Sequence, residues 1–213
     1  MFYIIRILMA FLGHAIKTAN DPNPPSPREV QPLCGLLSFL VPGLGQIYQG
    51  RVGKGVLFLV CIYALFFYGM YLGSGTVQAG SPPATYTVSG NVYLPQAPKQ
   101  NAPLPNLPQL LNDLYNRPQY LGQFWVGVVA WPALWQYLTY DENKEANPIF
   151  GRFERTPSDE ALNAIHTYGD KLTELGWVYT VIAGVLNIMV IYDAFAGPAF
   201  LARKTDHPRK ATA

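Results

Sequence analysis

Charged residues are scarce in this chain of 213 residues. Lysine, arginine, aspartate and glutamate together make up 13% of it, about half of their share in a typical soluble domain. None of the four occurs between Gly55 and Pro98. A fully solvated surface needs more charge than this, so the deficit predicts several segments that cross a lipid bilayer.

Cysteine and net charge are also low. The two cysteines, Cys34 and Cys61, lie within apolar segments, where free cysteine usually serves as a small buried hydrophobe, so no disulfide is predicted. The formal net charge is +2, and the 15 basic residues are scattered along the chain. Proteins that bind nucleic acid gather their basic residues into one patch. Nucleic acid is therefore not an expected partner.

Motifs for catalysis and metal binding are missing as well. The three histidines have no cysteine or carboxylate partners at metal-ligand spacing, so no zinc site is predicted. The sequence contains no G-x-S-x-G elbow and no recognisable Cys/His nucleophile pair. We therefore expect no enzymatic activity and neither a cofactor nor a metal.

The glycine-rich stretch around residue 50 does not fit a phosphate-binding loop. That motif needs a glycine where Tyr48 stands and a serine or threonine where Gly55 stands. Gly50 and Gly55 instead predict a tight chain reversal. The reversal would place Arg51 and Lys54 among the lipid headgroups.

Hydrophobic residues make up half of the chain, and they gather in four segments. The first segment, residues 33–49, is interrupted by Pro42, Gly43 and Gly45. Proline removes a backbone donor and glycine adds conformational freedom, so a continuous helix is costly here. The segment is either two half-helices or an arm that enters the membrane and turns back. In both cases other protein must cover its broken backbone.

The second segment, residues 56–72, is an unbroken apolar helix that completes a transmembrane hairpin over residues 33–75. With its flanking glycines it is long enough, at about 1.5 Å per residue, to cross a hydrocarbon core of about 30 Å. Gly69 and Gly73 form a G-x-x-x-G pair on one face. Such pairs let helices approach closely, so we expect a packing role.

The third and fourth segments cover residues 120–140 and 176–201. Three tryptophans and several tyrosines in the third suit a membrane border, and Pro132 predicts a kink. The sequence thus predicts an all-α membrane protein with three to four transmembrane helices, the first broken at Pro42–Gly45. Four spans with both termini in the cytoplasm are the favoured topology. The balance of basic residues is the same if the first arm is re-entrant, so charge does not choose between these topologies.

The two ends of the chain lie outside the four apolar segments. Residues 1–32 favour a retained interfacial helix followed by a proline-rich linker, because Arg6, His14 and Lys17 fall near one helical stripe. A cleaved signal peptide is the alternative for this region. Residues 202–213 form a basic tail.

Two polar regions separate the apolar segments. Residues 76–119 are rich in proline and predict a small irregular loop domain, in which residues 84–88 pair with residues 91–94 as a β-hairpin. Residues 141–175 predict a charged loop with an amphipathic helix that Thr156 caps. Neither region is large enough for its own core, so both should pack on the membrane part.

Two polar residues, Asn187 and Asp193, interrupt the fourth apolar segment as a candidate intramembrane pair. A carboxylate within a span is expensive and often functional. Because Asp193 lies near the segment's end, the favoured interpretation is a structural pairing with Arg51 or Lys54, or helix-end capping. An ion or proton role is the alternative. Asn187 favours an interhelical hydrogen bond.

Two runs of sequence resemble known membrane proteins. The run LLSFLVPGLGQIYQGRVGKGVLF resembles the turn of two-transmembrane-domain proteins, whose hairpins often carry a PGLG-x-x-Y-x-G-x-x-x-x-G pattern. That pattern falls on Pro42, Gly43, Leu44, Gly45, Tyr48, Gly50 and Gly55. With YTVIAGVLNIMVIYDAFAGPA near the end, the chain resembles an uncharacterised family of bacterial multi-pass membrane proteins. The acidic residue usual in that turn is absent, and the resemblance implies no assigned activity.

These features predict a multi-pass protein of the bacterial inner membrane that serves as a structural or protein-interaction component. Its expected partners are the lipid bilayer and either further copies of itself or other membrane proteins. The alternative is a small transporter or channel that uses Asp193, Asn187 and the Pro42–Gly45 break as a site at mid-membrane depth.

Overall fold

A computed structural model of the chain describes residue 13 and residues 31–95, 108–139, 149–169 and 171–197. This part is mostly helical, with one two-stranded sheet. Its elements are α2 (Pro32–Leu40), α3 (Leu44–Tyr48), α4 (Val52–Leu72), β1 (Ser74–Ala79), β2 (Ala84–Ser89), α5 (Gln109–Asn116), α6 (Gln119–Phe124), η2 (Val128–Ala130), α7 (Pro132–Leu138), α8 (Asp159–Tyr168) and α9 (Leu172–Ala196). The predicted basic tail, and all of the predicted interfacial helix and linker but residues 13, 31 and 32, lie outside the described residues.

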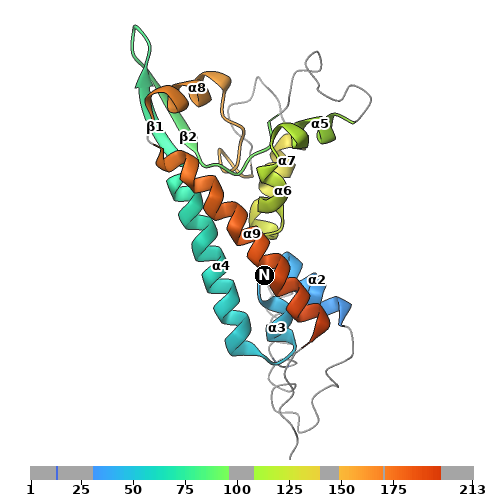
Figure 1. Ribbon diagram of the computed structural model, residues 1–213. Coiled ribbons are helices and arrows are strands. Elements are labelled where there is room, and N and C mark those ends of the chain that lie inside the picture. Colours follow the sequence, from blue (N-terminus) through green and yellow to red (C-terminus); the bar gives the residue numbers. More distant parts are fainter. Residues whose placement is uncertain (1–12, 14–30, 96–107, 140–148, 170, 198–213) are drawn as a thin grey trace, which may run out of the picture.

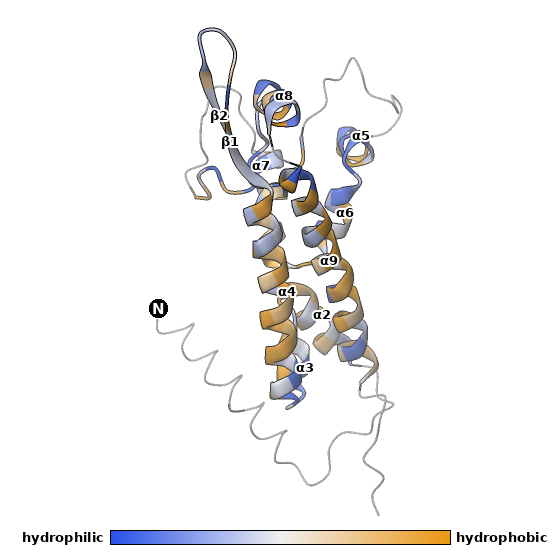
Figure 2. Ribbon diagram, turned by 60° about the vertical axis from the view of Figure 1, so that its left-hand side comes forward, coloured by the Kyte–Doolittle hydropathy of each residue, from blue (hydrophilic) through white to orange (hydrophobic). Residues whose placement is uncertain are grey.

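Helices α4 and α9 lie side by side and form the long axis of the fold (Figure 1). They have 21 and 25 residues, which correspond to about 31 and 37 Å. Among the described residues they are the two helices long and apolar enough to cross a membrane, and Figure 2 shows their apolar colouring along most of their length. The prediction of three to four such helices is not supported, because the first and third apolar segments are broken into short helices.

Residues 31–49, here called the lower arm, enter the fold and return to the same end of α9. The backbone N–H of Gln31 donates to Phe195 O at 3.0 Å, and Gln49 Nε2 donates to Ala194 O at 2.7 Å. Between these two contacts, Gly43 with a φ of 80° separates α2 from α3. The segment therefore consists of two short helices, as one of the two predicted arrangements has it, and its two ends also return to one place, as the other has it.

The predicted continuous helix over residues 120–140 is wrong. The structure divides this region into α6, η2 and α7. Gly127 adopts a φ of 100°, which L side chains rarely tolerate, and Pro132 begins α7 instead of kinking a longer helix. At the far end of α7, the Tyr137 hydroxyl donates to Asp113 Oδ2 in α5 at 2.6 Å. Residues 119–138, here called the upper arm, therefore double back as well.

The turns of the two arms meet beside α9. A Cβ on Gly127 would lie 2.3 Å from Leu40 O, so only glycine permits this approach. Around the contact, the ring of Phe39 lies 5.9 Å from that of Phe124 and 5.6 Å from that of Trp125, between centroids. The turn of each arm thus packs against the turn of the other.

Strands β1 and β2 and helix α8 form a small unit, here called the cap, beyond the end of α4 and the start of α9 (Figure 1). In it β1 and β2 pair antiparallel, with Ser74 opposite Ser89. The predicted pairing of residues 84–88 with residues 91–94 is wrong, because Val92 and Leu94 are buried in the main core instead of forming a strand. Burial of these two apolar side chains outweighs the short hairpin that their alternation suggested.

Helix α8 packs on the sheet through a second, smaller apolar cluster. Val88 of β2 and Ala161 and Ile165 of α8 are its buried members. The amphipathic helix was predicted, but its cap is Ser158, whose hydroxyl accepts the N–H of Ala161, and not Thr156.

Candidate functional site

The glycines singled out in the sequence lie at close backbone contacts. A Cβ on Gly43 would lie 2.0 Å from Gly55 O, and one on Gly45 would lie 2.0 Å from Cys34 O. These two contacts join the lower arm to α4 and close the arm on itself. Gly50, with a φ of 80°, forms the turn into α4.

The Gly69 and Gly73 pair faces α9 of the same chain. A Cβ on Gly69 would lie 2.8 Å from Gly176 O, and one on Gly73 would meet Asn91 at 2.6 Å. Gly176 begins a stripe of small buried residues on α9 that includes Thr180, Ala183 and Gly184. The G-x-x-x-G pair is therefore occupied by an intramolecular helix contact.

Asp193 is the centre of a charged cluster where α9 ends and α4 begins. Lys54 Nζ lies 2.6 Å from Asp193 Oδ1, and Arg51 Nη2 lies 3.0 Å from Oδ2. Gln46 Nε2 also donates to Oδ2 at 3.2 Å. The carboxylate is paired twice and its side chain remains 24% exposed. This arrangement neutralises the charge and joins the lower arm to both long helices.

A continuous chain of hydrogen bonds runs from Asp193 into the core. Gln46 accepts the Ser38 hydroxyl at 3.0 Å, and Ser38 O accepts Asn187 Nδ2 at 3.1 Å. The side chains of Gln46, Ser38 and Asn187 are fully buried. Asn187 and Asp193 do not bond to each other directly in the described structure, but Gln46 and Ser38 link them.

Asn187 joins the two arms to α9. Its amide also donates to Trp125 O at 2.8 Å, so one side chain satisfies a carbonyl from each broken segment. Such carbonyls are left without partners where helices end. Sequence reasoning gave Asn187 an interhelical bond but missed Ser38 and Gln46; their signal was the presence of polar side chains in an apolar segment.

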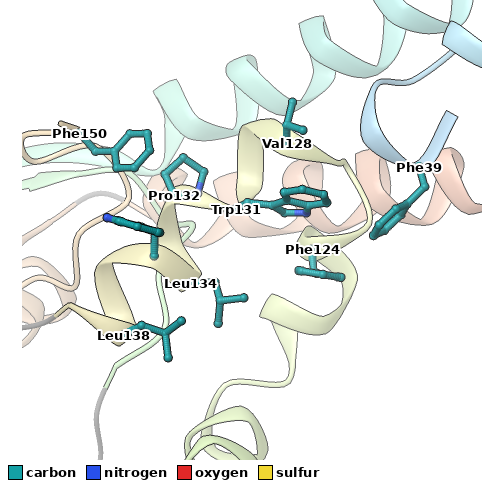
Figure 3. A pocket seen from close by; sticks show the side chains of 9 residues that line it. Phe39, Phe124, Val128, Trp131, Pro132, Leu134, Leu138 and Phe150 are labelled. Carbon is teal, nitrogen blue, oxygen red and sulfur yellow. The ribbon is translucent and has the colours of Figure 1, made fainter. Parts of the chain in front are cut away.

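The two arms line an open apolar cavity of about 570 Å³. Figure 3 shows the ring of Phe39 from the lower arm beside those of Phe124 and Trp131 from the upper arm, with Phe150 toward the other end of the cavity. Phe124 and Trp131 are stacked with their centroids 6.1 Å apart. The cavity can accept an apolar group, but its lining offers no set of convergent polar groups for catalysis.

Glu154 is a buried carboxyl group that the sequence did not reveal. It is 2% exposed, and its Oε2 accepts the N–H of Ala133 in the first turn of α7 at 2.9 Å. Burial raises the pKa of Glu154 to about 9, against a smaller opposing effect of that N–H. The group is therefore protonated at neutral pH in the folded chain.

Replacing Glu154 with glutamine should flatten the pH dependence of stability. The folded carboxyl keeps a proton that the unfolded chain releases near its ordinary pKa of 4.5, so stability falls as pH rises from 4.5 to about 9, by at most about 1.4 kcal/mol per unit. The melting temperature of E154Q in detergent, measured from pH 5 to 8, should fall less than that of the wild type. The exposed-site variant E160Q is the control; equal slopes for E154Q and wild type would contradict the prediction.

No metal centre is apparent in the part of the chain that the structure describes, since no three of its histidine, cysteine, aspartate or glutamate side chains gather. His166 lies 3.9 Å from Glu174, and both side chains are largely exposed.

Comparison with known proteins identifies a family without an assigned function. One curated relative, an uncharacterized protein of Methanocaldococcus jannaschii, is 47% identical over 38 residues, which are 17% of this chain and 38% of that protein. The match thus spans well under half of that relative. No solved structure matches the chain significantly. A family profile matches residues 33–207, which include both arms, α4, the cap and α9; the chain belongs to DUF6677, a family of unknown function.

Proposed function

We propose that this chain is an integral membrane protein in which α4 and α9 cross the bilayer and the two arms enter it from opposite faces. The observation that carries the proposal is the apolar surface of the two long helices. Leu57 and Val60 on α4 are 59% and 55% exposed, and Met189 and Val185 on α9 are 68% and 50% exposed. Only 28% and 33% of the apolar windows of α4 and α9 are buried inside the chain. A core helix of a soluble protein would be mostly covered.

The polar groups of this region support the same placement. The side chains of Ser38, Gln46, Thr180 and Asn187 are fully buried. Each makes at least one hydrogen bond within the chain, although Asn187 Oδ1 has no partner. In a bilayer no water is present to satisfy such groups, so a membrane protein must pair them internally. The membrane in question, by the sequence resemblance, is the inner membrane of a bacterium.

Within the membrane we propose a structural or protein-interaction role. The polar residues that a transport site would use are already engaged: Asp193 is held by Arg51 and Lys54, and Asn187 is held by two backbone carbonyls. A transporter or channel would need Asp193 and Asn187 to release these partners during its cycle. The apolar faces of α4 and α9 remain for lipid, a second copy or another membrane protein.

Site-specific photo-crosslinking in isolated membranes tests this proposal. The chain should stay in the membrane fraction after alkaline carbonate washing. A photoreactive residue at Leu57 or Met189, both exposed, should crosslink to a second copy or to a defined protein, whereas one at Val190, which is 5% exposed, should not. Release by carbonate would refute the membrane placement. Retention with crosslinks to lipid alone would refute the interaction role and leave the placement intact.

A further inference from the structure

A second cavity, of about 500 Å³, lies where the cap meets the ends of α4 and α9. Its wall combines Gly73 at the end of α4, Asn91 and Tyr93 after the sheet, Arg117 before α6, and Trp177 on α9. Unlike the apolar cavity between the arms, it has polar and charged groups in its lining. Its volume lies within the range of sites that hold small molecules, about 300 to 1,000 Å³.

Arg117 is the central charged group of this cavity. Its guanidinium lies 3.5 Å from the centre of the Tyr93 ring, and Nη2 donates to Asn91 O at 2.7 Å. Burial lowers the pKa of Arg117, and the nearby Tyr93 raises it; arginine nevertheless stays protonated in proteins. No carboxylate among the described residues forms an ion pair with it. Arg117 is partly buried, and a positive charge that is partly removed from water without a negative partner carries a desolvation cost.

Three buried polar atoms around Arg117 lack a hydrogen-bond partner. They are Arg117 Nε, Asn91 Oδ1 and Gln119 Oε1, and all three residues line the cavity. Asn91 is 5% exposed. Native proteins rarely leave such atoms unpaired. A ligand that satisfies these atoms would accept a hydrogen bond from the guanidinium and donate hydrogen bonds to the two amide oxygens.

The remaining charges at the rim favour an anion. Lys171 adds a second positive charge to the lining. Glu174, whose side chain is 65% exposed and lies near His166, adds one negative charge, so the lining keeps a net positive charge. A guanidinium binds phosphate through its planar set of donors.

We propose that this cavity binds a phosphate ester that carries hydroxyl groups, with Arg117 binding the phosphate and the amides of Asn91 and Gln119 binding the hydroxyls. Two sources share this chemistry: the headgroup of an anionic glycerophospholipid and a soluble glycerol phosphate. The cavity lies at one end of the two long helices, and Trp177, a residue common at membrane borders, is part of its wall. The phosphate site itself does not depend on the proposed membrane placement; the lipid as its source does.

Binding to the purified full-length chain separates these sources. Native mass spectrometry in detergent would compare phosphatidylglycerol with phosphatidylcholine, and calorimetry would measure soluble glycerol phosphate. We expect R117Q to bind the effective probe about tenfold more weakly or worse, as loss of a charged hydrogen-bonded contact implies. R152Q, which loses the same charge at an exposed residue outside this cavity, should bind like the wild type.

The probe that binds identifies the source of the phosphate ester, and the R117Q variant tests the site. Retention of phosphatidylglycerol alone identifies a lipid site, and binding of glycerol phosphate without lipid identifies a soluble ligand. If R117Q and wild type bind both probes equally, the proposal is wrong. If R117Q does not fold, Q119L serves in its place, because it removes an unpaired acceptor without changing a charge. Q119L should weaken binding several-fold. Unchanged binding by Q119L, or no binding of either probe by the wild type, overturns the proposal. Carbonate extraction of the same preparations reports separately on the membrane placement.

Discussion

Replacing Gly184 with alanine should destabilise the fold more than any other single added methyl group on α9. The new Cβ would lie 1.8 Å from Gly122 O, inside the contact between α9 and α6. Backbone cannot yield as a side chain can, so the upper arm must move away from α9. Overpacking of this kind costs about 1–3 kcal/mol, and sometimes more. We expect a lower melting temperature in detergent, measured by tryptophan fluorescence.

Gly53→Ala is the matched control for that experiment. Gly53 lies in α4, and a Cβ there would have no atom within 4 Å. Its replacement should be neutral or stabilise the helix by about 0.5–1 kcal/mol, because alanine restricts the unfolded chain and favours helix. Equal melting temperatures for G184A and G53A would show that α6 and α9 are not in the close contact described here.

Replacing Asn187 with leucine should also be strongly destabilising. The variant keeps the approximate volume of the side chain but removes both donors, so Ser38 O and Trp125 O lose their bonds from α9. A buried acceptor without a partner costs about 1–3 kcal/mol, although hydrogen bonds inside membranes have averaged less in double-mutant cycles. With two carbonyls affected, we expect a loss of about 2 kcal/mol or more. Chemical denaturation in mixed micelles measures this directly.

Tyr192→Leu controls for the loss of a polar atom from the same helix. Tyr192 is 70% exposed, so its replacement should change stability by less than about 0.5 kcal/mol. In N187L we further expect proteolysis to cut the arms before α4 or α9, because the two arms lose their shared attachment. A variant as stable and as protease-resistant as Y192L would mean that Asn187 does not hold the arms together.

The helical class and the two long helices could be predicted from the sequence because each is a local property. An unbroken apolar run such as residues 56–72 specifies a helix from length and composition alone. Pro42 followed directly by Gly43 likewise makes a continuous helix costly at that point, because proline lacks the backbone donor and glycine adds conformational freedom. A continuous helix was wrongly predicted for the third segment because its composition is apolar throughout. The break occurs at Gly127, which has a positive φ, and the sequence does not distinguish such a glycine from one inside a helix.

The charged cluster was within reach of the sequence, but the polar core was not. Charged residues are rare in and beside the apolar segments, so Asp193 could be expected to pair with Arg51 or Lys54. Ser38 and Gln46 look unremarkable in sequence. Their importance appears only when α2, α3 and α9 converge and place them between Asn187 and Asp193.

The sequence by itself determined that the chain is mostly helical, that residues 56–72 form a long apolar helix and that the first apolar segment breaks at Pro42–Gly45. The tertiary structure alone decided that both broken segments turn back and meet, that Gly69 and Gly73 contact α9 of the same chain, and that Arg117 Nε is buried near the unpaired amide oxygens of Asn91 and Gln119. The reason is physical. Helix formation and chain breaking depend on neighbours in sequence, whereas the satisfaction of a buried polar group depends on residues far apart in the chain, such as Asn187 and Ser38.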